Sequence, residues 1–538
     1  MNTNHSQKPS LLQHALTIFC IIAVTLIIFA PALQGHFLNW DDPSYITDNS
    51  LIQDISPENI LKTFSTYILG NYQPLTIFTF SIEYHFFKLN PFPYHLTNLI
   101  FHLLNIVLVY ILIFRLSRKY LVAILVGLFF ALHPTRVESV AWITERKDVL
   151  FAFFYLLGLI QYLQFLDSGR KIRKYVFYTT LCFLLSLLSK PSAMSFPLIL
   201  LLVDYIKSRT ITYKNILRKI PHLFISLLFG IIAIFGTFTP TNQAYPIGET
   251  IVQTLNHTIT PLDQVKASEE LFPLSARLII TCRALTTYFT KTVWIDHLSP
   301  YYPLPLKRNN RFTNDYYTAI TMIVLLALIL SLWKNTTLRF SILFFITTIF
   351  FNLPLSRVGS VETADRFTYI PYIGLFYLLA LLFEKIHQSL KSYQPKLAIV
   401  SFTIPAILLI SFAINTRTYA YTWKDSYQLW TNVIKNYPNN TKGYFNRGNY
   451  FFEEERYEEA LTDYKRALKI KPRNPKILYN IGNCFLRLGY LRWAFETYNQ
   501  ALKINPDYEL AQQRKLLLKN LLVPRVILND APENDNEF

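Results

Sequence analysis

The sequence predicts an all-α fold, in which a polytopic membrane helical bundle of about eleven spans is followed by a C-terminal α-solenoid. The composition indicates the membrane part. Of the 538 residues, 52% are hydrophobic and only 16% are charged, against roughly 25% in soluble domains. The solenoid is indicated by a sequence repeat with a period of 34 residues after Asn440, a length typical of stacked helix pairs.

Apolar segments occur along the first three quarters of the chain, several of them shorter than the roughly 20 residues of a full membrane span. Residues 277–295 could form an interfacial helix or a further crossing. The predicted spans lie near residues 14–33, 94–114, 120–133, 149–167, 175–189, 193–206, 219–239, 315–333, 340–355, 368–384 and 396–416.

The basic residues predict how these spans are oriented. They cluster in short connections between apolar segments, as the positive-inside rule expects of cytoplasmic loops. With the N-terminus inside, the outer face receives loops 34–93, 134–148, 240–314 and 356–367 and everything after about residue 417. The net charge of +18 therefore indicates membrane topology and lipid contact, and nucleic acid is a poor candidate partner. The main clusters are Arg115, Arg118 and Lys119; Arg170, Lys171, Arg173 and Lys174; and Lys207, Arg209, Lys214, Arg218 and Lys219.

This topology divides the chain into three parts. We expect a multi-pass membrane domain over residues 1–416, an extracytoplasmic repeat domain over 417–522 and an acidic, disordered tail over 523–538. The first apolar segment is read as a retained anchor, since no small-residue cleavage site precedes Gln34. A bacterial inner membrane is favoured, and the endoplasmic reticulum membrane would have equivalent topology.

The repeats resemble tetratricopeptide repeats in both period and pattern. Small residues allow close helix packing while aromatic residues fill the gaps, so these positions are expected to form the solenoid core. Residues 423–438 resemble the second helix of a truncated earlier repeat, and residues 507–522 a capping helix. Such arrays usually bind peptides or proteins. The matching positions are Asn446, Gly448, Ala460, Tyr464, Ala467 and Pro472, which recur as Asn480, Gly482, Ala494, Tyr498, Ala501 and Pro506.

Charged residues gather in the predicted outer loops. Asp41 and Asp42 directly follow the first span. Ionisable groups beside a membrane often bind a ligand or do chemistry, but an ordinary loop with mutual salt bridges explains such clusters about as well. Lys190 lies at another outer end, where snorkelling would account for it. The loop His133–Val149 contains Arg136, Glu138, Glu145, Arg146, Lys147 and Asp148, and the loop Ser356–Pro371 contains Arg357, Glu362, Asp365 and Arg366.

Other common site patterns are missing from the sequence. The four cysteines have no paired spacing, so neither a disulfide framework nor a zinc site is expected. The sequence contains no phosphate-binding P-loop and no GxSxG motif.

Three motifs stand out in the predicted outer loops: FLNWDDPSYI, HPTRVESVAWITERKDVL and ETADRFTYIPYIGL. Together with the repeats, they resemble the transmembrane and tetratricopeptide-repeat-containing (TMTC) family, whose members are O-mannosyltransferase-like proteins of the GT-C glycosyltransferase superfamily. The resemblance implies a GT-C-like membrane domain. It also implies transfer of a sugar, mannose in that family, from a polyprenyl-phosphate-linked donor to a hydroxyl of an extracytoplasmic acceptor, a protein or peptide bound through the repeats.

The resemblance also implies roles for individual residues. Asp41 or Asp42 would be the general base, and Glu138 would position the acceptor or the sugar. Cations would hold the departing lipid phosphate, so that no metal is required and no cofactor is expected. The phosphate-binding candidates are Arg136, Arg146, Lys147 and Arg366, with Lys190, Asp148 and Asp365 as supporting residues.

Three alternatives remain at this stage. A GT-C enzyme could act on a lipid or glycan acceptor. A transporter of lipid-linked sugars would be expected to show polar midplane helices or an internal duplication, and neither is visible. A non-enzymatic membrane-anchored scaffold would explain the repeats but not the charged outer loops.

Overall fold

The computed structural model describes residues 9–239, 244–250, 273–304, 307–308, 311–312, 320–321, 323–324, 327, 335–355 and 361–522. The chain forms two compact units, residues 1–425 and 426–538. Most of the predicted span 315–333, parts of the loops 240–314 and 356–367, and the predicted tail 523–538 lie outside the described residues.

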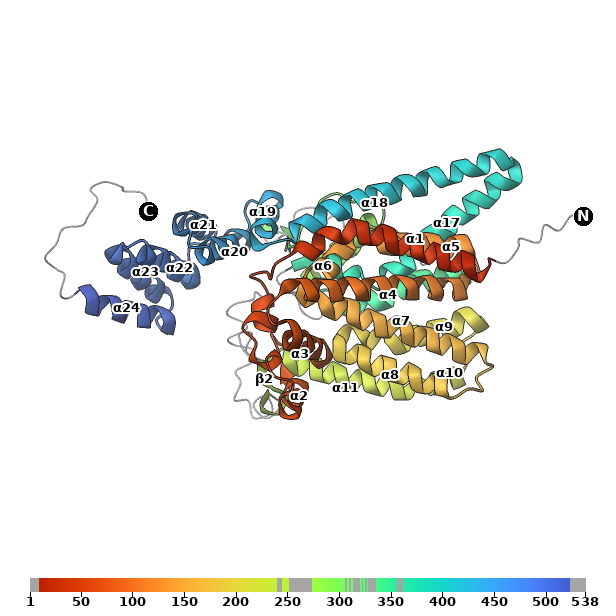
Figure 1. Ribbon diagram of the computed structural model, residues 1–538, viewed down its shortest axis with the longest axis horizontal. Coiled ribbons are helices and arrows are strands. Elements are labelled where there is room, and N and C mark those ends of the chain that lie inside the picture. Colours follow the sequence, from red (N-terminus) through yellow and green to blue (C-terminus); the bar gives the residue numbers. More distant parts are fainter. Residues whose placement is uncertain are drawn as a thin grey trace, which may run out of the picture. The chain divides into compact units, whose positions relative to one another are not determined.

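Long apolar helices form the body of the first unit (Figure 1). They coincide with ten of the eleven predicted spans, and the remaining one is the span at 315–333. These helices are α1 (Leu11–Phe29), α4 (Pro91–Ser117), α5 (Tyr120–Leu132), α7 (Arg146–Asp167), α8 (Lys174–Ser189), α9 (Phe196–Ser208), α11 (Ile220–Gly236), α16 (Thr336–Ile349), α17 (Tyr372–Tyr393) and α18 (Thr403–Thr422).

Five helical segments of the described chain are long and apolar enough to cross a membrane, or six if one bent pair forms a single span. Three shorter apolar helices accompany them. The predicted number of about eleven spans therefore counts some helices that are shorter than a full membrane span. The five segments are Leu11–Gln34, Pro91–Ser117, Ile143–Asp167, Tyr372–Tyr393 and Pro395–Thr422, the bent pair is Tyr120–Leu132 with Pro134–Ala141, and the shorter helices are Lys174–Ser189, Ile220–Gly236 and Thr336–Asn352.

Additional short helices and strand pairs organise the predicted outer loops. The loop 34–93 contains α2 (Pro57–Phe64) and α3 (Pro74–Phe87), and the segment 277–295 is largely a helix, α14 (Leu274–Lys291). Strand β1 (Thr66–Tyr67) pairs antiparallel with β2 (Tyr245–Pro246), and β3 (Tyr302–Pro303) pairs antiparallel with β6 (Val361–Thr363). A third antiparallel pair joins β4 (Lys307–Arg308) to β5 (Arg311–Phe312). The first two pairings thus join segments that are far apart in the sequence, whereas the third is local.

Helix α7 lies at the centre of the first unit, between α4 and α8 (Figure 1). Glycine allows two of the tight contacts here. A Cβ atom at Gly158 of α7 would lie 2.9 Å from the ring of Phe196, and one at Gly374 of α17 would clash with the Ser341 carbonyl of α16. These helices therefore approach more closely than any side chain would allow.

The second unit is a solenoid of antiparallel helix pairs, as the 34-residue repeat predicts. The Tyr464 ring lies against Gly448, and the Tyr498 ring lies against Gly482, so a Cβ at either glycine would be within 3 Å of the ring. Ala460, Ala467 and Ala494 are fully buried. The helices are α19 (Ser426–Asn436), α20 (Thr441–Glu453), α21 (Tyr457–Ile470), α22 (Pro475–Arg487), α23 (Leu491–Ile504) and α24 (Glu509–Leu522).

Candidate active site

The segment between α5 and α7 is compact and buried. Pro134 begins the short 3-10 helix η4 (Pro134–Arg136), which continues into α6 (Val137–Ala141) and η5 (Ile143–Glu145). Glu138 is 0% exposed and Glu145 is 1% exposed. An ordinary solvated loop would leave such side chains in water, so burial favours a site or a structural network.

Arg366 connects this segment to the loop before α17. Its backbone N–H donates to Glu138 Oε2 at 2.9 Å, and its guanidinium pairs with Glu138 Oε1. The Nε atom lies 3.3 Å from Glu145 Oε1, which also pairs with Lys147 Nζ at 3.0 Å. Burial lowers the pKa of Arg366, but the charges of Glu138 and Glu145 outweigh burial and hold it above its usual range. The guanidinium therefore stays charged.

Asp148 and Lys190 form a second ion pair beside the first. Asp148 Oδ1 pairs with Lys190 Nζ, and its Oδ2 atom accepts from the Ser139 hydroxyl at 3.0 Å. Lys190 also lies 5.8 Å from the ring of Phe367, next to Arg366 in the chain. The side chains of Lys147 and Lys190 are each 12% exposed and that of Arg366 is 18% exposed. These three cations reach the surface of the charged cluster, which is the group of ion pairs formed by Glu138, Glu145, Lys147, Asp148, Lys190 and Arg366.

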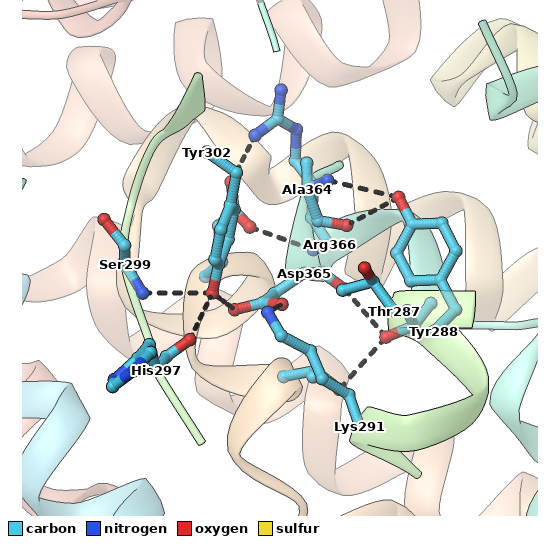
Figure 2. A network of polar contacts seen from close by, with 12 residues as sticks. Thr287, Tyr288, Lys291, His297, Ser299, Tyr302, Ala364, Asp365 and Arg366 are labelled. Atoms are coloured by element: carbon cyan, nitrogen blue, oxygen red, sulfur yellow. Dashed lines mark hydrogen bonds and ion pairs between the residues drawn. The ribbon is translucent and has the colours of Figure 1, made fainter. Parts of the chain in front are cut away.

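Asp365 lies in a third polar network (Figure 2). Its Oδ1 atom pairs with Lys291 Nζ at 2.7 Å, and its Oδ2 atom accepts from the Tyr302 hydroxyl at 2.7 Å. The Lys291 ammonium lies 3.8 Å from the Tyr302 ring centroid, and the Ser299 N–H donates to the Tyr302 hydroxyl at 3.0 Å. Asp365 therefore fixes the loops around β3 and β6 to the end of α14.

Asp42 is buried and connects the first loop to the same segment. One carboxylate oxygen accepts from the Leu38 N–H at 2.7 Å and the other from the Trp142 indole N–H at 2.8 Å. Burial, the largest influence, raises the pKa of Asp42, these two hydrogen bonds lower it and the Asp41 charge raises it. Together these influences give a pKa of about 7. Asp42 therefore orders the loop that presents Asp41.

Asp41 is half-buried, in contrast to its neighbour. Its charge acts on the Tyr45 phenol together with that of Lys147, whose Nζ atom lies 5.2 Å from the Tyr45 ring centroid. Lys147 Nζ also lies 5.9 Å from the ring of Trp142, the residue that holds Asp42. Asp41 is therefore the more accessible carboxylate on the side of Lys147.

Arg136 and Arg146, two predicted phosphate-binding residues, are 0% exposed and bind protein groups. Arg136 donates to the carbonyls of Thr368 and Tyr369 at 3.0 and 2.6 Å. Arg146 Nη2 lies within hydrogen-bond distance of both carboxylate oxygens of Glu83, at 3.0 and 3.1 Å, and of the Tyr94 carbonyl, at 2.8 Å. Both guanidiniums therefore hold segments of the protein together, in contrast to the partly exposed Lys147, Lys190 and Arg366.

A small pocket lies between the first two ion-pair groups. Its walls include Asp148, Lys190 and Arg366, and its volume is about 10 Å³. That is about the space needed for one water molecule. A ligand of the cluster would therefore meet the exposed edges of the cations rather than enter this pocket.

The structure adds four residues that the sequence prediction left out of the site: Glu145, Trp142, Lys291 and Tyr302. Glu145 and Trp142 lie within the motif HPTRVESVAWITERKDVL, so the sequence already indicated the segment to which they belong. Lys291 and Tyr302 lie in loop 240–314, and only tertiary structure brings them to Asp365. Within the described residues, no group of three His, Cys, Asp or Glu side chains could hold a metal ion.

The fold and these networks define a polytopic helical membrane protein with a tetratricopeptide solenoid. A family model described as TPR repeat matches residues 448–489, and one described as tetratricopeptide repeat matches residues 475–508. The predictions of a helical fold and of the repeats are confirmed.

Comparison with known protein sequences finds relatives that are named protein O-mannosyl-transferases. Over 84% of its length the chain is 24% identical to a Caenorhabditis elegans protein named protein O-mannosyl-transferase F38B6.6, of which it covers 62%. It is 24% identical to human protein O-mannosyl-transferase TMTC1 and 23% identical to human TMTC3, again over 84% of its length, and covers 54% and 51% of them. The chain thus spans about half to three fifths of these relatives, and the predicted resemblance to TMTC proteins is confirmed.

Among solved structures, the chain matches the apo oligosaccharyltransferase of Archaeoglobus fulgidus. The identity is 14%, the TM-score is 0.41, and the match covers 80% of this chain and 59% of the other.

Proposed function

We propose that the protein is a membrane glycosyltransferase that transfers a sugar from a polyprenyl-phosphate-linked donor to a hydroxyl of an extracytoplasmic acceptor. The observation that carries the proposal is the convergence of three partly exposed cations, Arg366, Lys147 and Lys190, beside the loop that presents Asp41. The relatives named protein O-mannosyl-transferases support it, and mannose is the sugar that their names suggest.

In this reaction the acceptor oxygen attacks the anomeric carbon of the sugar. Its proton passes to a carboxylate, the bond from that carbon to the phosphate oxygen breaks, and polyprenyl phosphate leaves with the electron pair. We assign the role of general base, which accepts this proton, to Asp41. Asp42 is fully buried, and its oxygens already accept hydrogen bonds from Leu38 and Trp142. Asp42 is then the residue that positions the loop.

The leaving phosphate gains negative charge as the sugar departs, so fixed cations nearby stabilise the transition state. Arg366, Lys147 and Lys190 are the groups proposed for this role, since their side chains reach the surface of the cluster. Glu138 holds Arg366 through two contacts and thereby orients it. Arg136 and Arg146 serve as positioning residues.

The tetratricopeptide repeats support a protein or peptide acceptor, because such arrays present an extended binding surface. We further propose that the N-terminus is cytoplasmic and that the charged loops and the repeats are extracytoplasmic, as the basic loops predict. The bacterial inner membrane is the proposed location.

Transfer of labelled mannose from polyprenyl-phosphate mannose to endogenous envelope proteins tests the function. Membranes would contain wild type, Asp41→Asn, Asp42→Asn or Glu138→Gln, each near-isosteric with the wild-type residue. Loss of a general base costs about 10²- to 10⁴-fold in rate. We expect such a loss for Asp41→Asn, with smaller losses for the two positioning variants.

The matched control is Asp54→Asn, which removes an exposed carboxylate from the same outer loop. It should transfer at the wild-type rate. Undiminished transfer by Asp41→Asn, Asp42→Asn and Glu138→Gln would reject this site. A membrane-anchored scaffold would then explain the protein better. Label found in lipid or glycan instead of protein would change only the proposed acceptor.

A further inference from the structure

A second cavity lies at the other end of α7 from the charged cluster. Helix α7 has 22 residues and is about 33 Å long at 1.5 Å per residue. Arg146 begins it beside the candidate site, and the cavity lies against its last two turns, which contribute Tyr162 and Phe165, between α8 and the start of α11. Its volume is about 450 Å³, far larger than the pocket at the candidate site.

Four cations line this cavity and one buried carboxylate opposes them. Arg170, Arg173, Arg218 and Lys219 contribute to the wall. Asp204 is 1% exposed and pairs with Lys219 at 2.9 Å and with Arg170 at 3.2 Å. In the part of the chain that the structure describes, Arg173 and Arg218 have no ion pair. The cavity therefore has an excess of positive charge.

A histidine in the same wall has an unsatisfied ring nitrogen. His222 is 6% exposed, and one of its ring nitrogens, Nε2, lies 3.1 Å from the Thr180 hydroxyl. The other, Nδ1, is buried without a hydrogen-bond partner in the described structure. Buried polar atoms are nearly always paired, so this nitrogen marks a polar group in the wall that the described side chains leave unsatisfied.

The rest of the wall combines apolar side chains with the hydroxyl-bearing residues Tyr162 and Thr179. Phe165 and Val176 line the cavity, and Phe177 lines it while remaining 64% exposed. A phosphate ion would use only the cations, whereas a lipid would place its headgroup among the cations and its chains along the aromatic and aliphatic side chains. The combination of charged and apolar lining favours an amphiphile.

We propose that this cavity binds the phosphate headgroup of an anionic membrane lipid, in the leaflet opposite the charged cluster. The phosphate oxygens would meet Arg173 and Arg218 beside His222, and the acyl chains would run along Phe177. The proposal does not depend on the proposed transfer reaction.

Native mass spectrometry of the full chain, released from detergent micelles after titration with lipid, tests the proposal. Phosphatidylglycerol is the probe, with phosphatidylcholine and inorganic phosphate as separate arms. We expect one retained phosphatidylglycerol in wild type and at least tenfold weaker retention in Arg173→Gln/Arg218→Gln. Val176→Trp, which fills the cavity without changing its charge, should weaken retention to the same extent.

The matched control is Lys385→Gln/Lys391→Gln, which removes two exposed cations from α17, also in a predicted cytoplasmic region. It should retain phosphatidylglycerol as wild type does. Wild-type retention by both cavity variants, or equal retention of phosphatidylcholine, would overturn the proposal. Displacement of phosphatidylglycerol by an equal concentration of inorganic phosphate would overturn the lipid assignment and leave a free-phosphate site.

Discussion

Two adjacent carboxylates of this protein occupy different environments. Asp42 is fully buried and accepts two N–H groups, whereas Asp41 is half-buried on the side of Lys147. Their chemical identity and neighbouring positions make them indistinguishable in sequence. Burial separates their properties, since desolvation raises the pKa of the enclosed carboxyl.

The raised pKa of Asp42 predicts a pH-dependent stability. Between its ordinary value of 3.8 and the folded value of about 7, the folded protein binds this proton more readily than the unfolded chain does. Stability should therefore fall as pH rises across this interval and then level off. Asp42→Asn removes the titration, so the melting temperature of the variant relative to wild type should increase from pH 4 to pH 7 in detergent. A difference that stays constant with pH would contradict the assignment.

At the scale of elements, buried cations fix short helices to one another. Arg136 of η4 holds the end of η8 (Asp365–Thr368) through the carbonyls of Thr368 and Tyr369, and its guanidinium lies 5.1 Å from the Tyr369 ring centroid. The loop that carries Arg366 is thereby fixed against the segment that carries Glu138. Such hydrogen bonds explain why an arginine, and not an apolar residue, is buried there.

Arg136→Met should destabilise the first unit. The substitution keeps much of the side-chain length but leaves the carbonyls of Thr368 and Tyr369 without their donors, at a cost of about 1–3 kcal/mol. A lower melting temperature of the purified protein would show this loss. Lys385→Met removes a positive charge from an exposed position on α17 and should melt as wild type does. Equal melting of the two variants would contradict a structural role for Arg136.

The close contact between α16 and α17 predicts that a larger residue at Gly374 lowers the stability of the protein. Gly374→Ala would place a methyl group against the Ser341 carbonyl, so the helices must separate or shift, at a cost of about 1–3 kcal/mol. We expect reduced thermal stability. Gly248→Ala is the control, because a Cβ there meets nothing within 4 Å. Melting of Gly374→Ala at the wild-type temperature would show that the two helices pack less closely.

At the scale of the whole molecule, the distribution of basic loops predicts which face of the membrane each loop occupies. Glu58 lies in the first predicted outer loop and Lys171 in a predicted cytoplasmic basic loop, and both are exposed. Each would be changed to cysteine in a chain with Cys20 and Cys282 replaced by serine. A membrane-impermeant maleimide should label Glu58→Cys in intact cells and Lys171→Cys only after permeabilisation. Labelling of both in intact cells would reject the predicted orientation.

Most of the helical architecture could be predicted from sequence, for identifiable reasons. A membrane span needs a long apolar segment, and α4 and α18 show one directly. A solenoid repeats its packing contacts, so Gly448 with Tyr464 predicts Gly482 with Tyr498. Short helices such as α3 were missed as elements because they lie in a loop without a membrane-length apolar segment.

The candidate site was predicted less completely than the helices. The sequence placed Glu138, Lys147 and Arg366 in charged loops, and the structure joins these loops through ion pairs with Glu138 and Glu145. It could not show that Arg136 and Arg146 are enclosed, because charge alone does not reveal burial. Nor could it pair Asp365 with Lys291, which lies 74 residues away.

The sequence by itself determined the helical class, the repeats and the residue types available to a site, because hydrophobic length, repeat period and side-chain chemistry are local properties. Only the tertiary structure decided which charges meet and which are exposed. Burial and distance depend on segments far apart in the chain, as with Trp142 and Asp42, which are 100 positions apart. The same physical reason applies to Arg173 and Arg218, whose shared cavity exists only because α8 packs near the start of α11.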